Sequence, residues 1–416
     1  MDYGAGIRQE DRRWAPGRSA PIARSHQSLL RRRSLNPNPY QFTERELELQ
    51  RTLREFTARE ITPRTLEMDR KAEIPTDLRK KLAELGCYGR ILPKEVGGQA
   101  GTEMELCIQE EELAYGNMSV SGSTLATCLG SIPVCFYGTK DQQARFLIPV
   151  IKGDVITTIG ITEPNAGSDA ASLQSTAVRD GNDYILNGSK RYIDNTACAQ
   201  YFTIWAKTDP SAGYKGISTF VVPRNAPGFN IDGVYDLLGM RPLGVGGFSY
   251  KDVRVPIEDR IGEEGQGWYH MMRMLVYGRT STAAMCLGLS QAALDAAKKH
   301  ALTRQQFGQP IGNFQAIRFK IADMAVSVLT ARLLVYHAAR LIDSGDGAER
   351  EASMAKFYGA ETVQRVTQEA VQIHGGDGVN KDYPIEMFFR DARIFSIGEG
   401  TSEIHRNVTA KRELGL

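Results

Sequence analysis

The spacing of apolar residues divides the chain into helical and strand-rich parts. Thr43 and Glu46 have the spacing of a helix capping box, and apolar residues follow at helical intervals up to Phe56. Thr62-Pro63 is expected to end this helix. Further amphipathic helices are predicted over residues 77–85, 103–115 and 142–151. The first ordered part of the chain is therefore expected to be helical.

From residue 155 the pattern becomes typical of β-strands. Short runs rich in β-branched and aromatic residues predict strands over 155–159, 201–208, 217–222 and 250–255. Asn187-Gly188 lies between two such runs and predicts the turn of a β-hairpin. The helical period then returns in three long segments, 283–303, 314–343 and 351–374.

Strands that lie between runs of helices favour separate layers over a doubly wound sheet. We therefore expect an α+β chain with an N-terminal all-α domain, a middle small antiparallel β domain and a C-terminal four-helix-bundle-like α domain. The expected bounds are 1–40 for a disordered Arg-rich extension, and 41–154, 155–262 and 263–416 for the three domains. No Gly-x-Gly-x-x-Gly follows a strand, so a Rossmann dinucleotide site is not expected.

Composition narrows the class of protein. The 416 residues are 42% hydrophobic and 24% charged, as in soluble globular proteins. No apolar run approaches the roughly 20 residues that cross a bilayer, so no membrane span is expected. A net charge of +2 gives no electrostatic case for binding nucleic acid. The six cysteines form no Cys-x-x-Cys pair and the six histidines no His-x-x-x-His pair, which predicts reduced thiols and no metal site.

Residues 1–40 differ from the rest in charge. They contain eight arginines, no lysine and three acidic residues. An arginine-rich, acid-poor start is typical of a mitochondrial transit peptide, but the acids and four prolines among these residues interrupt an amphipathic helix. We therefore expect a disordered extension on a cytoplasmic protein, with the mitochondrial matrix as the alternative.

Two separated segments indicate the chemistry. Residues 161–169 combine a strand end, a turn proline and Gly167-Ser168, which suits a loop that approaches a phosphate or a flavin closely. Much later, Glu399 stands between Gly398 and Gly400. A carboxylate held in an apolar cleft can act as a general base. Glu399 is therefore the candidate catalytic residue. The alternative is that it is an exposed loop glutamate without a catalytic role.

Several motifs in a fixed order carry a resemblance to a known family. They are Thr162-Glu163-Pro164-x-Ala166-Gly167-Ser168-Asp169, 187–190 (Asn-Gly-Ser-Lys), 304–308 (Arg-Gln-Gln-Phe-Gly), 372–378 (Gln-Ile-His-Gly-Gly-Asp-Gly), 390–393 (Arg-Asp-Ala-Arg) and 399–401 (Glu-Gly-Thr). With the order of helical and strand-rich parts, they resemble the acyl-CoA dehydrogenase family from about residue 42 to the C-terminus.

The resemblance implies an FAD enzyme that converts an acyl-CoA thioester into its trans-2-enoyl form. Glu399 would remove the α-proton while a hydride leaves the β-carbon for flavin N5. The thioester carbonyl would receive hydrogen bonds from the Glu399 backbone N–H and from a flavin hydroxyl. The resemblance also implies an electron-transfer flavoprotein as partner, a homotetramer and a role in fatty acid or acyl-CoA catabolism.

Site residues follow from the resemblance position by position. The cofactor-binding set is Ile161, Thr162, Gly167, Ser168, Tyr192, Asp194, Arg304, Gln306, Phe307, Gln372, Gly375, Gly376, Thr401 and Glu403, and the substrate set is Ser168 and Arg279. The segments around Arg304 and Gln372 match those that reach the adenosine half of FAD from a neighbouring subunit. Tyr192 as a core residue, and Gly375-Gly376 as a plain helix-ending turn, stay as alternatives.

Asp194 departs from the family pattern, which commonly has threonine at this position near flavin N5. An ionised aspartate donates no hydrogen bond, and its charge would oppose an anionic reduced flavin. A flavin oxidase or monooxygenase on the same fold is therefore a competing hypothesis. Ser121 stands where the glutaryl-specific branch carries an arginine, which favours a neutral acyl group. Two further hypotheses are a carrier-protein thioester as the substrate and a binding protein without enzymatic activity.

Overall fold

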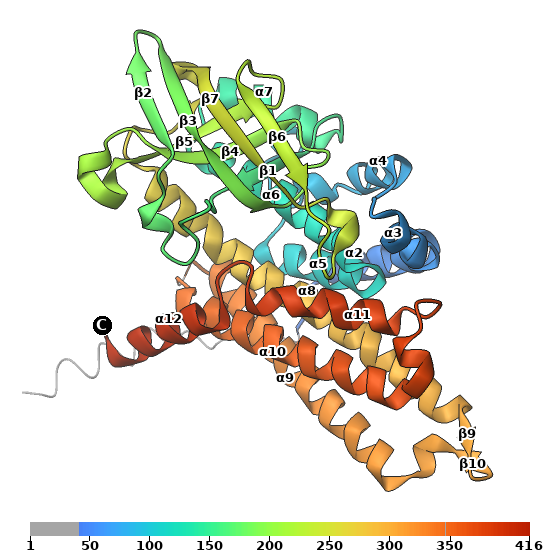
Figure 1. Ribbon diagram of the computed structural model, residues 1–416. Helices are drawn as coiled ribbons and strands as arrows, with labels where there is room; N and C mark the ends of the chain where they lie inside the picture. The colour runs from blue at the N-terminus through green and yellow to red at the C-terminus, as the bar shows by residue number, and fades with distance from the viewer. Residues whose placement is uncertain (1–40, 346) are drawn as a thin grey trace, which may run out of the picture. The chain divides into compact units, whose positions relative to one another are not determined.

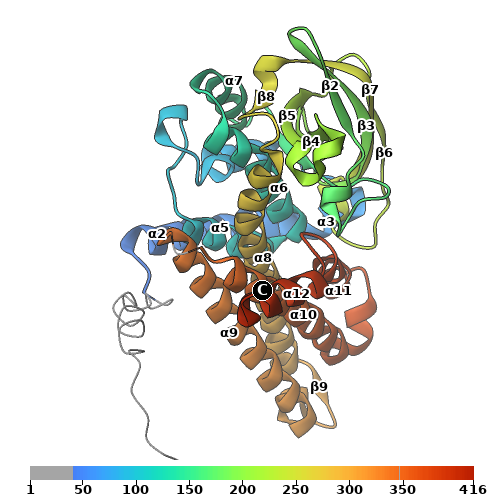
Figure 2. The same ribbon diagram turned by 90° about the vertical axis from the view of Figure 1, so that its left-hand side faces the viewer.

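The computed structural model describes residues 41–345 and 347–416, in which a β-sheet lies at one end and the long helices of the C-terminal part lie toward the other (Figures 1 and 2). The predicted disordered extension, 1–40, lies outside the described residues. The first helical part comprises α2 (Glu44–Phe56), α3 (Thr65–Lys71), α4 (Thr76–Glu84), α5 (Glu103–Gly116), α6 (Met118–Tyr137) and α7 (Lys140–Ile151). The capping box of Thr43 and Glu46 is present at the start of α2. Pro63 does not end the helical path, because a π-helical turn and a 3-10 turn continue it to Arg64.

Helix α6 was not predicted from the sequence, because it is buried on nearly all sides and shows no amphipathic period. Its residues are almost all buried, and Asn117 caps its start by accepting from the N–H groups of Ser119 and Val120. By length and composition alone, α6 and the later helix Gln315–Asp343 are long and apolar enough to cross a membrane. The apolar window of α6 is 89% buried inside the protein, as in the core helix of a soluble protein.

The middle part is an eight-stranded sheet. Its strands are β1 (Thr157–Gly160), β2 (Thr176–Asp180), β3 (Asp183–Ile193), β4 (Tyr201–Lys207), β5 (Ile217–Pro223), β6 (Phe229–Val234), β7 (Gly246–Pro256) and β8 (Arg260–Ile261). Their order is β6-β7-β3-β2-β4-β5-β8, and β1 pairs with β4. All these pairs are antiparallel except β1–β4 and β2–β4, which are parallel. The sheet therefore matches the expected small β domain, with two parallel pairs added.

The hairpin predicted at Asn187-Gly188 is wrong. These two residues lie inside β3, at a register shift against β7, and Asn187 exchanges hydrogen bonds with Asp252 on β7. The turn that joins β2 to β3 is instead at Gly181, whose φ is 63°. Asn-Gly suits a bulge as well as a turn, and tertiary pairing with β7 decided between them.

The last part is a set of long packed helices. It comprises α8 (Gly267–Thr303), α9 (Gln315–Asp343), α10 (Glu349–His374), α11 (Ile385–Ala392) and α12 (Ser402–Leu414), with a small hairpin of β9 (Gln305–Gln306) and β10 (Gln309–Pro310). Helix α8 packs against α5, α6, α9 and α10, so one apolar core joins both helical parts. The sequence placed its start at Ala283, well after Gly267, and missed α11 and α12.

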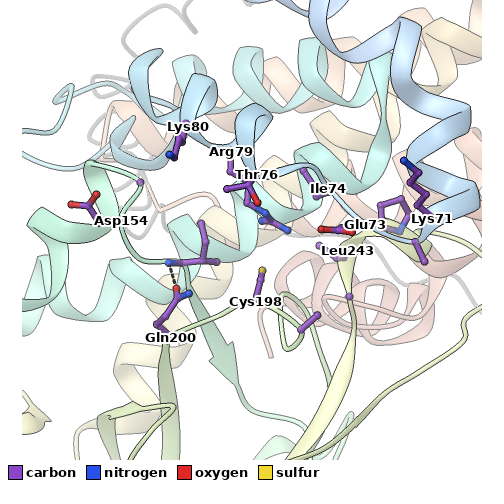
Figure 3. Close-up of a pocket in the computed structure, with 16 residues that line it drawn as sticks. Lys71, Glu73, Ile74, Thr76, Arg79, Lys80, Asp154, Cys198, Gln200 and Leu243 are labelled. Carbon is purple, nitrogen blue, oxygen red and sulfur yellow. Dashed lines mark hydrogen bonds between the residues drawn. The ribbon is translucent and has the colours of Figure 1, made fainter.

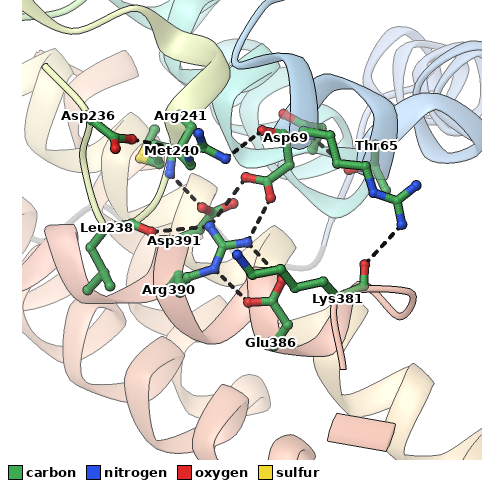
Figure 4. Close-up of polar contacts among 12 residues, drawn as sticks. Thr65, Asp69, Asp236, Leu238, Met240, Arg241, Lys381, Glu386, Arg390 and Asp391 are labelled. Atoms are coloured by element: carbon green, nitrogen blue, oxygen red, sulfur yellow. Dashed lines mark hydrogen bonds and ion pairs between the residues drawn. The ribbon is translucent and has the colours of Figure 1, made fainter. Parts of the chain in front are cut away.

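A polar junction holds all three parts together (Figure 4). Arg390 of α11 donates to the carboxylates of Asp69 on α3 and Glu386, and to the carbonyl of Leu238 in the β part. The neighbouring Asp391 accepts the backbone N–H of Met240 at 2.5 Å. Arg390 and Asp391 therefore link α11 to α3 and to the loop that precedes β7.

Candidate active site

Glu399 lies in a tight loop between α11 and α12. Its φ is 54° and that of Gly400 is 88°, so two successive residues are left-handed. His405 on α12 donates from Nε2 to the Glu399 carbonyl over 2.9 Å, which requires the proton on Nε2 because a carbonyl can only accept. Thr401 caps α12 by accepting from the N–H of Ile404. The start of α12 therefore anchors the backbone of the candidate base.

The side chain of Glu399 enters the space between α6 and α8. Its Oε2 atom is buried and has no hydrogen-bond partner among the described residues. A Cβ atom at Gly278 would lie 2.9 Å from this oxygen and 3.3 Å from Leu129, so the glycine leaves the room that the carboxyl group occupies. Burial raises the pKa of Glu399, while the charges of Lys356 and Arg279 oppose that rise. This is the environment of a tunable base.

Two other ionisable predicted residues adjoin Glu399. Arg279 is buried on α8, and its Nη1 atom lies 3.7 Å from Glu349 without a hydrogen bond. Burial lowers the pKa of Arg279, and Glu349 and Glu399 oppose the shift. Asp194 has a pKa raised to about 7, first by burial and then by the charge of Glu399. The structure therefore brings two carboxyl groups and a buried cation close together.

The predicted cofactor loop at 161–169 is fixed by hydrogen bonds to β3 on one side and is exposed on the other. Glu163 and Ala166 form a short antiparallel bridge, and the buried ammonium of Lys190 donates to the Glu163 carboxylate and to the carbonyl of Ile161. Thr162 accepts the N–H of Arg191 through its carbonyl. Gly167 and Ser168 are exposed, and no atom lies within 4 Å of a Cβ built on Gly167. The backbone of this loop is free to contact a ligand.

Tyr192 is not a core tyrosine, since 56% of it is exposed. Its φ is 56°, its ring lies 5.2 Å from that of Tyr235, and the guanidinium of Arg191 lies 5.1 Å from its centroid. A large exposed ring on a strained backbone is unusual for packing alone. Next to it, the Asp194 carbonyl accepts from the hydroxyl of Thr158, which fixes the backbone but not the carboxyl group.

A second group of predicted residues lies far from Glu399 within one chain. Arg304, Gln306 and Phe307 are exposed on the β9–β10 hairpin, and Phe307 is 91% exposed. Gln372, Gly375 and Gly376 lie at the end of α10, where the rings of His300 and His374 lie 4.3 Å apart and so join the two segments. At 1.5 Å per residue, Gln372 is about 24 Å along α10 from Lys356, which contacts the Glu399 loop. One chain therefore does not bring all predicted cofactor residues together.

Glu403 completes the predicted set. It is exposed in the first turn of α12, and its pKa is lowered by hydrogen bonds to the backbone there and to Thr401. Glu403 is therefore separate from the carboxyl groups of Glu399 and Asp194, and its exposed side chain is accessible to a ligand at the surface.

Three residues that support the site were not singled out from the sequence: Lys190, Lys356 and His405. Lys356 could have been recognised, because it interrupts an apolar face of α10 that otherwise consists of Ala352, Ala360 and Val363. A lysine at such a core position is rarely tolerated without a polar partner. Lys190 stood within the 187–190 motif without a role assigned to it, and His405 gave no comparable signal.

A cavity of the described chain lies away from Glu399 (Figure 3). It has a volume of 460 Å³ and is lined by α3, α4 and the loops around Cys198 and Leu243. None of the predicted site residues lines it. Arg79 borders it and donates to Ser123, which in turn donates to Asn195 beside Asp194. These hydrogen bonds link the edge of the cavity to Asn195, the residue after Asp194.

Family models of acyl-CoA dehydrogenase match nearly all of the described chain. The N-terminal domain model matches residues 43–154, the middle domain model 158–253 and the C-terminal domain model 265–414. All residues of the predicted site lie within the middle and C-terminal matches.

Individual proteins agree with the family models. The caffeyl-CoA reductase-Etf complex subunit CarC of Acetobacterium woodii is 39% identical over 88% of this chain and 97% of its own. The structure of butyryl-CoA dehydrogenase from Megasphaera elsdenii has a TM-score of 0.87 at 35% identity, covering 90% of this chain and 99% of that one. PigA with FAD and proline has a TM-score of 0.88 at 26% identity, with coverage of 91% and 99%.

Proposed function

Because this chain belongs to the acyl-CoA dehydrogenase family, a family of FAD enzymes, we propose that it oxidises the α,β bond of an acyl-CoA thioester with Glu399 as the base. One observation carries the assignment of the base. The Glu399 carboxyl oxygen is buried without a partner among the described residues, near two cations and beside the space left by Gly278. A carboxylate that only stabilised the fold would be expected to have a hydrogen-bond partner.

The residues of both predicted cofactor groups suit FAD. Gly167, Gly375 and Gly376 have nothing within 4 Å of a built Cβ, so their backbone can approach phosphate or sugar oxygens closely. Tyr192 and Phe307 expose aromatic rings that would be covered by a planar ligand. When bound, FAD supplies the acceptor for the hydride that leaves the β-carbon.

The chain's own residues would perform the proton transfer. Glu399 takes the α-proton, and burial makes its carboxylate a stronger base than a solvated one. The charges of Lys356 and Arg279 oppose the rise of the Glu399 pKa and favour its ionised form. In the reverse reaction the protonated Glu399 would return the proton to the same carbon, so reductases on this fold need no different acid.

We extend the proposal to the partners of the enzyme. The family resemblance favours a homotetramer and an electron-transfer flavoprotein as electron acceptor, with a role in fatty acid or acyl-CoA catabolism. The exposed apolar side chains of α9, which include Phe319, Val326 and Leu329, support an assembly because such a face is costly in water. Only 39% of the apolar window of α9 is buried within one chain, and a neighbouring subunit would cover the remainder. The cytoplasm is the proposed location, with the mitochondrial matrix as the alternative.

The decisive experiment is a spectroscopic one. The purified protein, loaded with FAD, is mixed without oxygen with a panel of acyl-CoA esters of different length and branching, and the oxidised flavin band is followed. Rapid bleaching by at least one neutral acyl-CoA is expected. If no thioester bleaches the flavin, the dehydrogenase assignment fails. Peroxide formed in air at the rate of bleaching would favour the oxidase hypothesis.

A further inference from the structure

We propose that Lys356 is the positioning residue of this active site, whose buried ammonium clamps the loop that carries Glu399 and sets the electrostatic environment of the base. The inference rests on the proposed role of Glu399. Lys356 lies on α10, whereas the loop it contacts lies between α11 and α12, so the contact is purely tertiary.

The clamp is built from three hydrogen bonds. The Nζ atom of Lys356 donates to the carbonyls of Phe395 at 2.7 Å, Gly398 at 2.5 Å and Gly400 at 2.5 Å. An ammonium has three donors, and all three are used. The acceptors lie on both sides of Glu399. Movement of this loop by one residue in either direction would break at least one of the bonds.

The loop needs such support because its backbone is strained. A left-handed conformation is unfavourable for a residue with a side chain, and Glu399 has a φ of 54°. A Cβ atom at Gly400 would lie 2.9 Å from the ring of His405, so the loop also packs tightly against α12. Without the clamp, the backbone of Glu399 is expected to relax, and its carboxyl group would leave the space beside Gly278.

The ammonium also acts through its charge. Lys356 is completely buried, and its pKa is lowered to about 8 by that burial, so most of it keeps its proton at neutral pH. The charged or titratable groups that influence it are Glu399, Arg279 and Cys286, and it lowers the pKa of His405 in turn. Lys356 stabilises the ionised form of Glu399, which opposes the effect of desolvation.

A merely structural lysine makes different predictions. Lys190 offers the comparison, because it is also fully buried and donates to the carbonyls of Ile161 and Trp205 and to Glu163. Its contacts support the 161–163 loop, so its loss should reduce FAD retention. The loss of Lys356 should instead leave FAD bound and impair the proton transfer.

The test compares Lys356→Met, Lys356→Arg and Glu399→Gln in the full-length FAD-loaded protein. Lys298→Met serves as control, because Lys298 is half exposed and pairs with Asp295 on its own helix. Anaerobic flavin reduction by an acyl-CoA that bleaches the wild type is followed from pH 6 to 9, together with FAD content and thermal midpoint.

Lys356→Met should retain FAD and reduce it about 10²-fold more slowly, the scale expected when a reacting group is misplaced by about 1 Å. The apparent pKa of the base should rise, because a neighbouring cation is gone. Lys356→Arg keeps the charge but cannot match three converging carbonyls, so its rate should fall while the pH profile stays. Lys298→Met should match the wild type.

A wild-type rate and pH profile in FAD-loaded Lys356→Met would overturn the inference. If that variant does not fold, Lys356→Arg decides, and a wild-type rate there would overturn it. Glu399→Gln separates the two proposals. If flavin reduction is slow in Glu399→Gln but fast in Lys356→Met, only the proposed role of Lys356 is wrong. If flavin reduction is fast in Glu399→Gln, the proposed function with Glu399 as the base is wrong.

Discussion

Two carboxyl groups, those of Glu399 and Asp194, define the site at the level of single residues. Burial raises the pKa of both, but their surroundings differ. Glu399 has Lys356 and Arg279 as opposing charges, while no cation among the described residues is found to oppose the rise at Asp194. The two cations therefore favour the ionised form of Glu399, whereas Asp194, with a pKa of about 7, is close to half protonated near neutral pH.

The first prediction concerns Glu399→Gln. Glutamine keeps the size of the side chain but cannot accept a proton at neutral pH, so flavin reduction should slow by about 10³-fold or more. FAD content and binding of the acyl-CoA should be retained. Stopped-flow measurement of flavin reduction checks this. Glu403→Gln is the matched control, since Glu403 is exposed and should tolerate the change; exchanged effects of the two variants would refute the assignment.

The second prediction concerns pH and Asp194. Below pH 7 its carboxyl group is mostly neutral, and above pH 7 it becomes an anion that opposes electron uptake by the neighbouring flavin. The midpoint potential of the wild-type flavin should therefore fall more steeply above pH 7 than that of Asp194→Asn or Asp194→Thr. Reductive titrations from about pH 6 to 8.5 measure this. Equal pH dependence in the three proteins would show that Asp194 does not influence the flavin.

Among the elements, the packing of α6 against α8 decides whether Glu399 fits. Gly278 is an interior residue of a 37-residue helix, where alanine would normally stabilise by about 1 kcal/mol. Here the added Cβ would lie 2.9 Å from the Glu399 carboxyl oxygen. Alanine at position 278 would therefore stabilise the helix but take the space that the Glu399 carboxyl group occupies.

The third prediction follows from this conflict. Gly278→Ala should fold with an unchanged or raised thermal midpoint, retain FAD, and reduce it at least about 10-fold more slowly, because Glu399 must rotate away. Gly359→Ala on α10 is the control, since its Cβ would meet neighbours only at 3.5 Å, and it should retain full activity. Thermal unfolding and flavin reduction are measured side by side. A fully active Gly278→Ala would mean that the carboxyl group does not depend on this space.

At the scale of the whole molecule, the predicted cofactor residues form two groups that one chain keeps apart. Glu399, Asp194 and Tyr192 belong to one group, and Phe307 and Gln372 to the other. If both groups bind one extended FAD, the second must come from another copy of the chain. An exposed Phe307 and the apolar face of α9 are consistent with such a contact.

The fourth prediction tests this assembly. Leu329→Glu, on the exposed face of α9, should shift the protein toward smaller species and lower its FAD content, because a buried unpaired charge opposes the contact. Val178→Glu, an exposed apolar position on β2, should change neither. Light scattering and flavin absorbance give the two readouts. An FAD-loaded wild-type monomer would contradict the proposed assembly.

Sequence alone determined the elements whose signals are local. The capping box at Thr43, the amphipathic helix α4 and the β-branched core of β5 each contain their own pattern, so their positions were predicted within a residue or two. Glu399 was recognisable for the same reason, because the glycines on both sides of it give the backbone conformational freedom. The family resemblance then supplied the cofactor and the reaction.

Tertiary structure decided what depends on remote partners. Helix α6 is buried on nearly all sides and so has no solvent-exposed polar face to reveal it. The Asn187-Gly188 pair became a bulge because β7 lies beside it. Lys356 became a clamp because three carbonyls of a distant loop surround its ammonium. A sequence contains the groups that can donate or be buried, but the free energy of each depends on the partners that folding brings to it.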